Sequence, residues 1–366
     1  MIIRKEPFGY MYLNLENGFN IELLSNQVKK EFNVIDNSEG KQGLFFNQPL
    51  VLDIYFSFEC NFNCNFCFNK LHSYPKSELM NKRTIEETIK YIIDKGIYIV
   101  NILGGEPLKK PQKDKVFYFI KKLREKNKKV VIDLTTNAYY INKEVILFLK
   151  RYDVKLNISL LSIKEKSFQK ITNHNNVKKI KRNILNFVDN KIQYGVSTPI
   201  IKTNYNDFND IIKFTNSLNF KSWVLRYPTY KKNNNFNFKL VDFFKKSRKV
   251  KEKSNKEIKF DAPFSYKFFY EDIEETISNK IDKLLTRCSG GNYKIQILPN
   301  GDIHRCILLI DKKKKIGNIF DEDFSLNKPN FINKKCDCKL KKYCKVCEGY
   351  LIINKLEYDD RCKNEI

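Results

Sequence analysis

Three cysteines on one short segment carry the clearest chemical signal in this sequence. Cys60, Cys64 and Cys67 have the spacing C-x3-C-x2-C. Three thiolates on one loop can bind three irons of a cubane iron–sulfur cluster, which normally has four ligands, so the fourth iron stays open to a substrate or cofactor. Zinc is the alternative, but it usually takes paired C-x2-C knuckles and four protein ligands. Three cysteines without a fourth nearby in the sequence fit zinc poorly, so the spacing predicts an iron–sulfur site.

The other seven cysteines lie within residues 286–366. Their spacing is C-x12-G-x4-C, then C-x-C-x5-C-x2-C, then a last cysteine fourteen residues on: Cys288, Cys306, Cys336, Cys338, Cys344, Cys347 and Cys362. In a reducing compartment so many thiols bind metal more readily than they form disulfides. A zinc ribbon is the alternative for this tail, because Cys344 and Cys347 have the spacing of one zinc knuckle.

The elements that position the first cysteines follow from the hydrophobic pattern between residues 50 and 230. Strands are predicted over 51–56, 98–103, 130–135, 155–160, 193–200 and 222–226, and helices over 83–95, 114–127, 143–151, 177–189 and 207–217. Six strands that alternate with helices indicate a parallel sheet or barrel. The cysteine loop directly follows the first strand, and the loops after strands form the functional face of such a barrel.

Three further segments flank this α/β region. Residues 1–48 form a small module in which Asn17-Gly18 predicts a hairpin of strands 10–15 and 19–24, followed by a helix over 27–32. Residues 231–285 are interpreted as a linker with helices, including a Lys-rich exposed helix within 239–259. Residues 286–366 form the cysteine-rich domain, in which residues 294–298 and 303–306 form a hairpin.

The cysteine loop resembles that of the radical S-adenosylmethionine (SAM) superfamily, with Phe66 as the aromatic residue before the third cysteine. Gly104-Gly105-Glu106-Pro107, at the end of the second strand, matches the GGEP motif of that superfamily. The resemblance implies a [4Fe–4S] cluster on Cys60, Cys64 and Cys67 that binds SAM. It also implies that cofactor contacts come from the turns after the strands: Phe66, Gly104, Gly105, Glu106, Pro107, Asn137, Ser159 and Arg226. The glycines are interpreted as letting the backbone approach a ligand closely.

The sequence departs from the superfamily pattern at two of these turns. Ala138 stands where relatives often have the Gly of Thr-Asn-Gly, and the Asp-Gly that peptide-modifying relatives carry after Ser159 is missing.

The C-terminal cysteines resemble the SPASM extension, whose seven-cysteine pattern binds two auxiliary [4Fe–4S] clusters. Two spacings are each one residue shorter than in that pattern, but the order is the same. The resemblance assigns Cys288, Cys306 and Cys347 to the first auxiliary cluster, which then lacks a fourth cysteine. It assigns the remaining four to the second cluster: Cys336, Cys338, Cys344 and Cys362. The expected fold is therefore α/β, a partial (β/α)6 TIM-type barrel with the N-terminal module and a SPASM domain.

Composition and charge limit the location and the partners. Hydrophobic residues make up 42% and aromatic residues 14% of 366 residues, which indicates a folded chain. No stretch approaches the roughly 18 apolar residues of a membrane span, and the first ten residues do not read as a secretory signal, so we expect a cytoplasmic protein. The net charge of +26 suits nucleic acid or an acidic peptide. Because the lysines are dispersed along the chain, the charge favours an acidic peptide over nucleic acid as the partner.

The resemblance also implies an activity. Such an enzyme reductively cleaves SAM to a 5′-deoxyadenosyl radical and, with this tail, crosslinks or oxidises a ribosomally synthesised peptide. The implied partners are a precursor peptide or protein with an acidic leader and a reductant such as flavodoxin or ferredoxin. The N-terminal module is a candidate for peptide recognition by strand addition. No catalytic side chain is assigned.

Two alternatives stay open. Sulfatase-type protein oxidation is disfavoured because Ile307 stands where that branch has an Asp. An RNA-modifying radical SAM enzyme shares the barrel loop and the positive charge, but gives no reason for seven C-terminal cysteines.

Overall fold

The computed structural model describes residues 2–7, 9–14, 18–21, 34–39, 46–70, 72–190, 192–220, 222–228, 240–261, 289–312, 315–321, 326 and 347–355. The helix expected over 27–32 and five of the C-terminal cysteines lie outside these residues. Among the described helices, none is long and apolar enough to cross a membrane.

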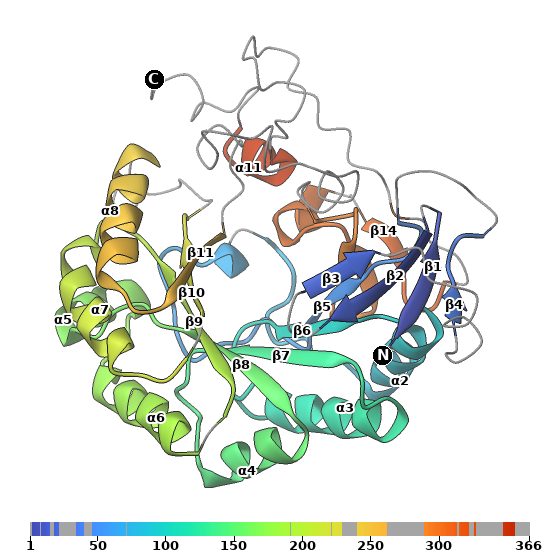
Figure 1. Ribbon diagram of the computed structural model, residues 1–366, viewed down its shortest axis with the longest axis horizontal. Helices are drawn as coiled ribbons and strands as arrows, with labels where there is room; N and C mark the ends of the chain where they lie inside the picture. Colours follow the sequence, from blue (N-terminus) through green and yellow to red (C-terminus); the bar gives the residue numbers. More distant parts are fainter. Residues whose placement is uncertain are drawn as a thin grey trace.

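One large sheet of ten strands forms the body of the molecule (Figure 1). Its order is β11-β10-β9-β8-β7-β6-β5-β12-β13-β14, and every pairing from β11 to β12 is parallel. The parallel strands are β5 (Val51–Tyr55), β6 (Ile99–Leu103), β7 (Val131–Thr136), β8 (Val154–Ser159), β9 (Tyr194–Pro199), β10 (Ser222–Arg226), β11 (Glu257–Asp261) and β12 (Lys294–Ile297). The antiparallel strands β13 (Asp302–His304) and β14 (Lys315–Asn318) complete one edge.

Helices cover the outer face of this sheet (Figure 1). They are α2 (Lys82–Asp94), α3 (Gln112–Lys126), α4 (Lys143–Arg151), α5 (Glu165–Thr172), α6 (Val177–Asp189), α7 (Phe208–Asn216) and α8 (Leu240–Lys253). Short helical segments are η1 (Phe68–Lys70), η2 (Tyr205–Asp207), η5 (Ile307–Lys312) and α11 (Glu348–Ile353). Every second residue of β6 and β8 is buried in one core with apolar residues of α2, α3 and α6. Apolar residues at every second position of a strand lie on one face of the sheet, and apolar residues at helical spacing form a stripe along one side of a helix. The strands and helices bury these apolar sides against each other.

The observed elements confirm the expected α/β alternation and extend it. The predicted bounds of α4, α6 and β10 agree with the structure. The helix α5, the strand β11 and the parallel pairing of β12 with β5 were not predicted. The Lys-rich helix expected within residues 239–259 is present as α8, and the strand β11 follows it, so the sheet continues beyond six strands. A partial TIM-type barrel is consistent with this architecture.

A buried carboxylate attaches the C-terminal hairpin to the first barrel strand. The side chain of Asp53, 3% exposed, accepts a hydrogen bond from Asn101 Nδ2 at 2.7 Å and lies 3.1 Å from Lys294 Nζ. Asp53 is level with Asn101 on β6 and with Gln296 on β12. The expected hairpin of β12 and β13 is therefore present, and it is part of the barrel sheet.

The N-terminal residues form a separate four-stranded sheet with the order β3-β2-β1-β4. Its strands are β1 (Ile3–Glu6), β2 (Gly9–Asn14), β3 (Gly18–Ile21) and β4 (Val34–Asp36). The antiparallel pairing of β2 with β3 agrees with the expected hairpin, whereas β1 and β4 were not predicted. Among the described strands, β3 lies at one edge of this sheet with β2 as its neighbour.

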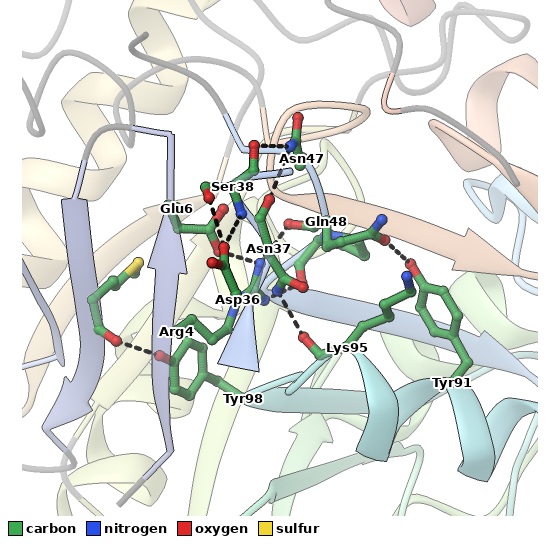
Figure 2. A network of polar contacts seen from close by, with 12 residues as sticks. Arg4, Glu6, Asp36, Asn37, Ser38, Asn47, Gln48, Tyr91, Lys95 and Tyr98 are labelled. Atoms are coloured by element: carbon green, nitrogen blue, oxygen red, sulfur yellow. Dashed lines mark hydrogen bonds and ion pairs between the residues drawn. The ribbon is translucent and has the colours of Figure 1, made fainter. Parts of the chain in front are cut away.

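Polar contacts attach the N-terminal sheet to the start of the barrel (Figure 2). The Arg4 guanidinium donates to the carbonyls of Gln48 and Pro49 at 2.9 and 2.6 Å, immediately before β5. Asn37 donates to the carbonyl of Lys95 at 3.0 Å, and Tyr98 donates to the carbonyl of Met11 at 2.7 Å. The sheet therefore packs against the end of α2 and the starts of β5 and β6.

Arg4 and Glu6 form an ion pair whose side chains are both fully buried. Burial raises the pKa of Glu6 from 4.5 to about 7, although the neighbouring Arg4 opposes this shift. A carboxylate without water loses solvation that one cation replaces only in part. The N-terminal sheet therefore contains a carboxyl group that titrates near neutral pH.

We predict that this group makes the stability of the protein depend on pH. Because the pKa of Glu6 is higher in the folded state, its contribution is complete below pH 4.5 and is lost as the pH rises through about 7. The wild type should lose on the order of 3 kcal/mol over this range relative to Glu6→Gln, whose side chain does not titrate. Urea unfolding of both proteins across the range checks this. Parallel pH profiles would contradict it.

Candidate active site

The loop after β5 carries Cys60, Cys64 and Cys67, and the end of α5 holds it in place. The amide of Asn63 donates to the carbonyl of Thr172 and the amide of Asn65 to that of Ile171, both at 3.0 Å. The last carbonyls of a helix have no partner within the helix, so the loop amides satisfy them. The helix missing from the sequence prediction therefore supports the cysteine loop.

The three loop thiols lie in a partly shielded environment and interact with one another. Burial raises the pKa of Cys60 to about 12. Burial also raises the pKa of Cys64, and the neighbouring Cys67 and Cys60 add to that shift. Without a metal these thiols stay protonated at neutral pH, whereas iron would hold them as thiolates. Among the described cysteines no disulfide forms. Three thiols on one loop with no competing disulfide fit the donor set of an iron–sulfur cluster.

The side chain of Glu106 links the turn after β6 to the turn after β7. Glu106 is 1% exposed and accepts hydrogen bonds from Thr136 Oγ1 at 2.7 Å, the Asn137 amide at 2.8 Å and the Leu108 amide at 3.1 Å. Burial raises its pKa to about 7 despite these three donors. Its contacts here organise the two turns, and its predicted contact with SAM stays a prediction.

Asn137 connects these turns to the cysteine loop. Its Nδ2 donates to Asn61 Oδ1 at 2.9 Å and lies 3.9 Å from Cys60 Sγ. Residue 138 has φ 61°, a left-handed backbone that favours the glycine found in relatives, although Ala138 occupies it here. The turn after β7 therefore keeps the backbone of the motif without its glycine.

Gly104 and Gly105 are required by the neighbouring backbone. A Cβ at Gly104, where φ is 138°, would lie 2.4 Å from the carbonyl oxygen of Ser57, and one at Gly105 would lie 1.9 Å from that of Glu59. The amides of Gly105 and Glu106 donate to these same carbonyls at 3.0 and 2.9 Å. The close approach that these glycines permit here is by the segment between β5 and the cysteine loop, and their predicted approach to a ligand stays a prediction.

Replacing Gly105 by alanine should displace the cysteine loop. A backbone carbonyl cannot move aside as a flexible side chain can, so we expect a cost of about 1–3 kcal/mol and lower iron content after reconstitution. Gly195→Ala is the matched control, because a Cβ there would lie 3.4 Å from its nearest atom, the Ser222 carbonyl oxygen. Thermal unfolding and iron analysis of both variants check this. Equal iron content and stability would contradict it.

The other predicted cofactor residues lie at the ends of neighbouring strands. Ser159 ends β8 and is level with Ser197 of β9, whose Oγ accepts a hydrogen bond from Arg226 Nε at 2.6 Å. Arg226 ends β10 and is exposed. Phe66 packs against Leu161, Ile171 and Ile201, whereas Pro107 is buried in the turn after β6. The predicted residues thus share one edge of the sheet, and Arg226 supplies a cation suited to a carboxylate.

Of the C-terminal cysteines, Cys306 and Cys347 are described. Arg305 and Glu348, their chain neighbours, form an ion pair. A Cβ at Gly290 would lie 2.7 Å from the Arg305 carbonyl oxygen, so Gly290, two residues after Cys288, lies beside the residue that precedes Cys306. Cys288, Cys336, Cys338, Cys344 and Cys362 lie outside the described residues. In the described part of the chain, no group of three or more His, Cys, Asp or Glu side chains is arranged to hold a metal ion.

Comparison with known families identifies the central domain. Residues 54–215 match the family model described as the Radical SAM superfamily. The chain carries a radical SAM domain. This domain begins in β5, includes the cysteine loop and the Gly104–Pro107 turn, and ends in α7.

Curated relatives of this chain share moderate sequence identity with it. The GTP 3′,8-cyclase of Aquifex aeolicus is 27% identical over 76% of this chain and 88% of its own length. The GTP 3′,8-cyclase of Helicobacter pylori strain HPAG1 is 29% identical over 43% of this chain and 49% of its own. The chain thus spans about half the length of several relatives that it matches.

Solved structures show the same fold at lower identity. Streptococcus suis SuiB bound to the precursor peptide SuiA is 20% identical with a TM-score of 0.79, covering 99% of this chain and 98% of that chain. Native anSMEcpe with bound AdoMet is 19% identical with a TM-score of 0.59, covering 82% and 90%. The first similarity includes the N-terminal sheet as well as the barrel.

Sequence reasoning missed the residues that support the site. Asn61, Thr136 and the carbonyl ends of α5 hold the predicted residues in place through the contacts given above. Thr136 stands beside Asn137 and was visible in the motif, but no spacing pointed to Asn61 or α5.

Proposed function

We propose that the protein is a radical SAM enzyme that crosslinks or oxidises a ribosomally synthesised peptide. The N-terminal sheet is the observation that carries this proposal. It lies outside the radical SAM domain match, it is attached to the starts of β5 and β6, and the fold similarity that includes it is to a protein bound to a precursor peptide.

The edge strand β3 suits the recognition of an extended peptide. A strand edge can bind a peptide through main-chain hydrogen bonds, and β3 lies at the edge among the described strands. The net charge of +26 favours an acidic leader. The N-terminal sheet would then hold the leader while the segment to be modified reaches the barrel.

The arrangement of the barrel residues supports the cofactor chemistry. When bound, a [4Fe–4S] cluster with SAM supplies the reductive cleavage that yields the 5′-deoxyadenosyl radical. Cys60, Cys64 and Cys67 would hold the cluster, and Asn137 lies beside Cys60. Arg226, oriented by Ser197, would bind the SAM carboxylate. Cys306 and Cys347 would bind the first of two auxiliary clusters, and the protein's task is to orient these groups and exclude water.

GTP cyclisation is the second candidate, because the curated relatives bear the name GTP 3′,8-cyclase and one matches over 76% of this chain. The test gives the anaerobically reconstituted protein SAM and dithionite with either GTP or a candidate precursor peptide that has an acidic leader. We expect 5′-deoxyadenosine together with loss of hydrogen mass from the peptide, and no change in GTP. A converted GTP with an unchanged peptide would overturn the proposal.

A further inference from the structure

The solvent side of the cysteine loop is exposed and basic. Asn63, Asn65 and Lys70 of the loop are exposed, and so are Lys166 and Lys170 on the adjoining helix α5. Asn65 Nδ2 donates to the Lys170 carbonyl at 2.7 Å, and Lys70 Nζ donates to the Asn63 carbonyl at 3.1 Å. These five residues therefore form one continuous surface, which we name the loop–α5 patch.

The loop–α5 patch lies directly over the predicted cluster ligands. Cys64 packs against a small apolar cluster that contains Ile171, the neighbour of Lys170 in the chain. Lys70 is close enough to Cys64 and Cys67 for its charge to lower the pKa of both thiols, although burial is the larger effect and raises them. A protein seated on this patch would be separated from the cluster ligands by little more than the loop itself.

The positive charge of the loop–α5 patch is not neutralised by its neighbours. Lys166 and Lys170 form no ion pair within the part of the chain that the structure describes. In contrast, the nearby Lys164 lies 2.9 Å from Asp210, and Lys109 pairs with Glu59. Lys166 and Lys170 are also one helical turn apart, so they lie on the same side of α5. The patch therefore presents free ammonium groups to a partner.

We propose that the loop–α5 patch is the docking surface for an acidic one-electron carrier protein of the flavodoxin or ferredoxin class. This inference rests on the proposed function, because it requires the cluster on Cys60, Cys64 and Cys67. The carrier loses one electron and the bound cluster gains it, with no bond made or broken. Such carriers are acidic, and complementary charge around a contact chiefly accelerates association and orients the partner.

Charge reversal on α5 tests the proposal with reduced flavodoxin as the probe. Lys166→Glu combined with Lys170→Glu should weaken flavodoxin binding, measured by calorimetry at low salt, about tenfold or more. The flavodoxin-supported rate of SAM cleavage should fall with it, whereas the rate supported by dithionite should not change. The wild-type affinity should decrease with added salt. Lys70 is left unchanged because its side chain contacts the loop backbone.

A second double variant controls for net charge. Lys90→Glu with Lys121→Glu places the same charge change on exposed positions of α2 and α3, away from α5 (Figure 1). It should bind flavodoxin as the wild type does. Equal binding by all three proteins, or equal weakening by both variants, would overturn the docking surface. If the wild type makes no 5′-deoxyadenosine even with dithionite, the proposed function fails instead.

Discussion

Cys64→Ala should abolish SAM cleavage and remove about four of the roughly twelve irons that three four-iron clusters would bring to each chain. Two remaining thiolates cannot hold three irons, so the cluster on this loop should be lost. Iron and sulfide analysis after anaerobic reconstitution, with chromatography for 5′-deoxyadenosine, measures both effects. The variant should still fold, because Cys64 is only partly buried, where it packs against the margins of the main core and of a small apolar cluster.

Cys306→Ala provides the comparison at the other predicted cluster. The same loss of one thiol should lower the iron content by about four as well, but SAM cleavage should persist because the barrel cluster is intact. Hydrogen loss from the peptide should disappear in both variants. If Cys64→Ala retained cleavage, the assignment of the SAM-binding cluster to this loop would be wrong. A wild-type content near four irons would instead remove the auxiliary clusters from the proposal.

The parts of the fold that sequence could predict are those whose burial follows a simple period. Strands β6, β7, β8 and β10 alternate buried and less buried residues, and α4 and α6 carry regular apolar stripes, so their bounds were close to correct. The motif residues Cys60, Gly104 and Asn137 were also placed at the same edge of the sheet, because the ends of parallel strands meet there.

The elements that were not predicted are rich in charged residues, so their hydropathy does not indicate a packed helix or strand. Helix α5 has eight residues with few apolar positions, and its N-cap residue Lys164 makes no side-chain capping bond. Strand β11 follows a Lys-rich helix and contains charged residues at alternate positions. Strand β1 reads as exposed because it contains Arg4, Lys5 and Glu6, yet Arg4 and Glu6 are buried against each other. Hydropathy cannot detect a charge that a partner distant in space neutralises.

Removing the guanidinium of Arg4 should have the largest effect on stability. Arg4→Met leaves the Glu6 carboxylate buried without its cation and leaves the carbonyls of Gln48 and Pro49 without their donors. Breaking a buried pair on one side typically costs about 3–5 kcal/mol, because an uncompensated charge remains. The loss should concentrate in the N-terminal sheet, whose β1–β2 amides should lose protection from hydrogen exchange while those of β7 and β8 keep theirs.

The double variant Arg4→Met with Glu6→Leu separates the charge from the packing. Because it removes both ions, it should recover part of the loss, and the two carbonyls without donors account for the remainder. The cost of Arg4→Met alone should also be smaller at pH 5 than at pH 8, since Glu6 becomes neutral as the pH falls below about 7. A double variant less stable than Arg4→Met, or a cost that does not change with pH, would show that Arg4 stabilises the sheet by its backbone contacts and not by neutralising Glu6.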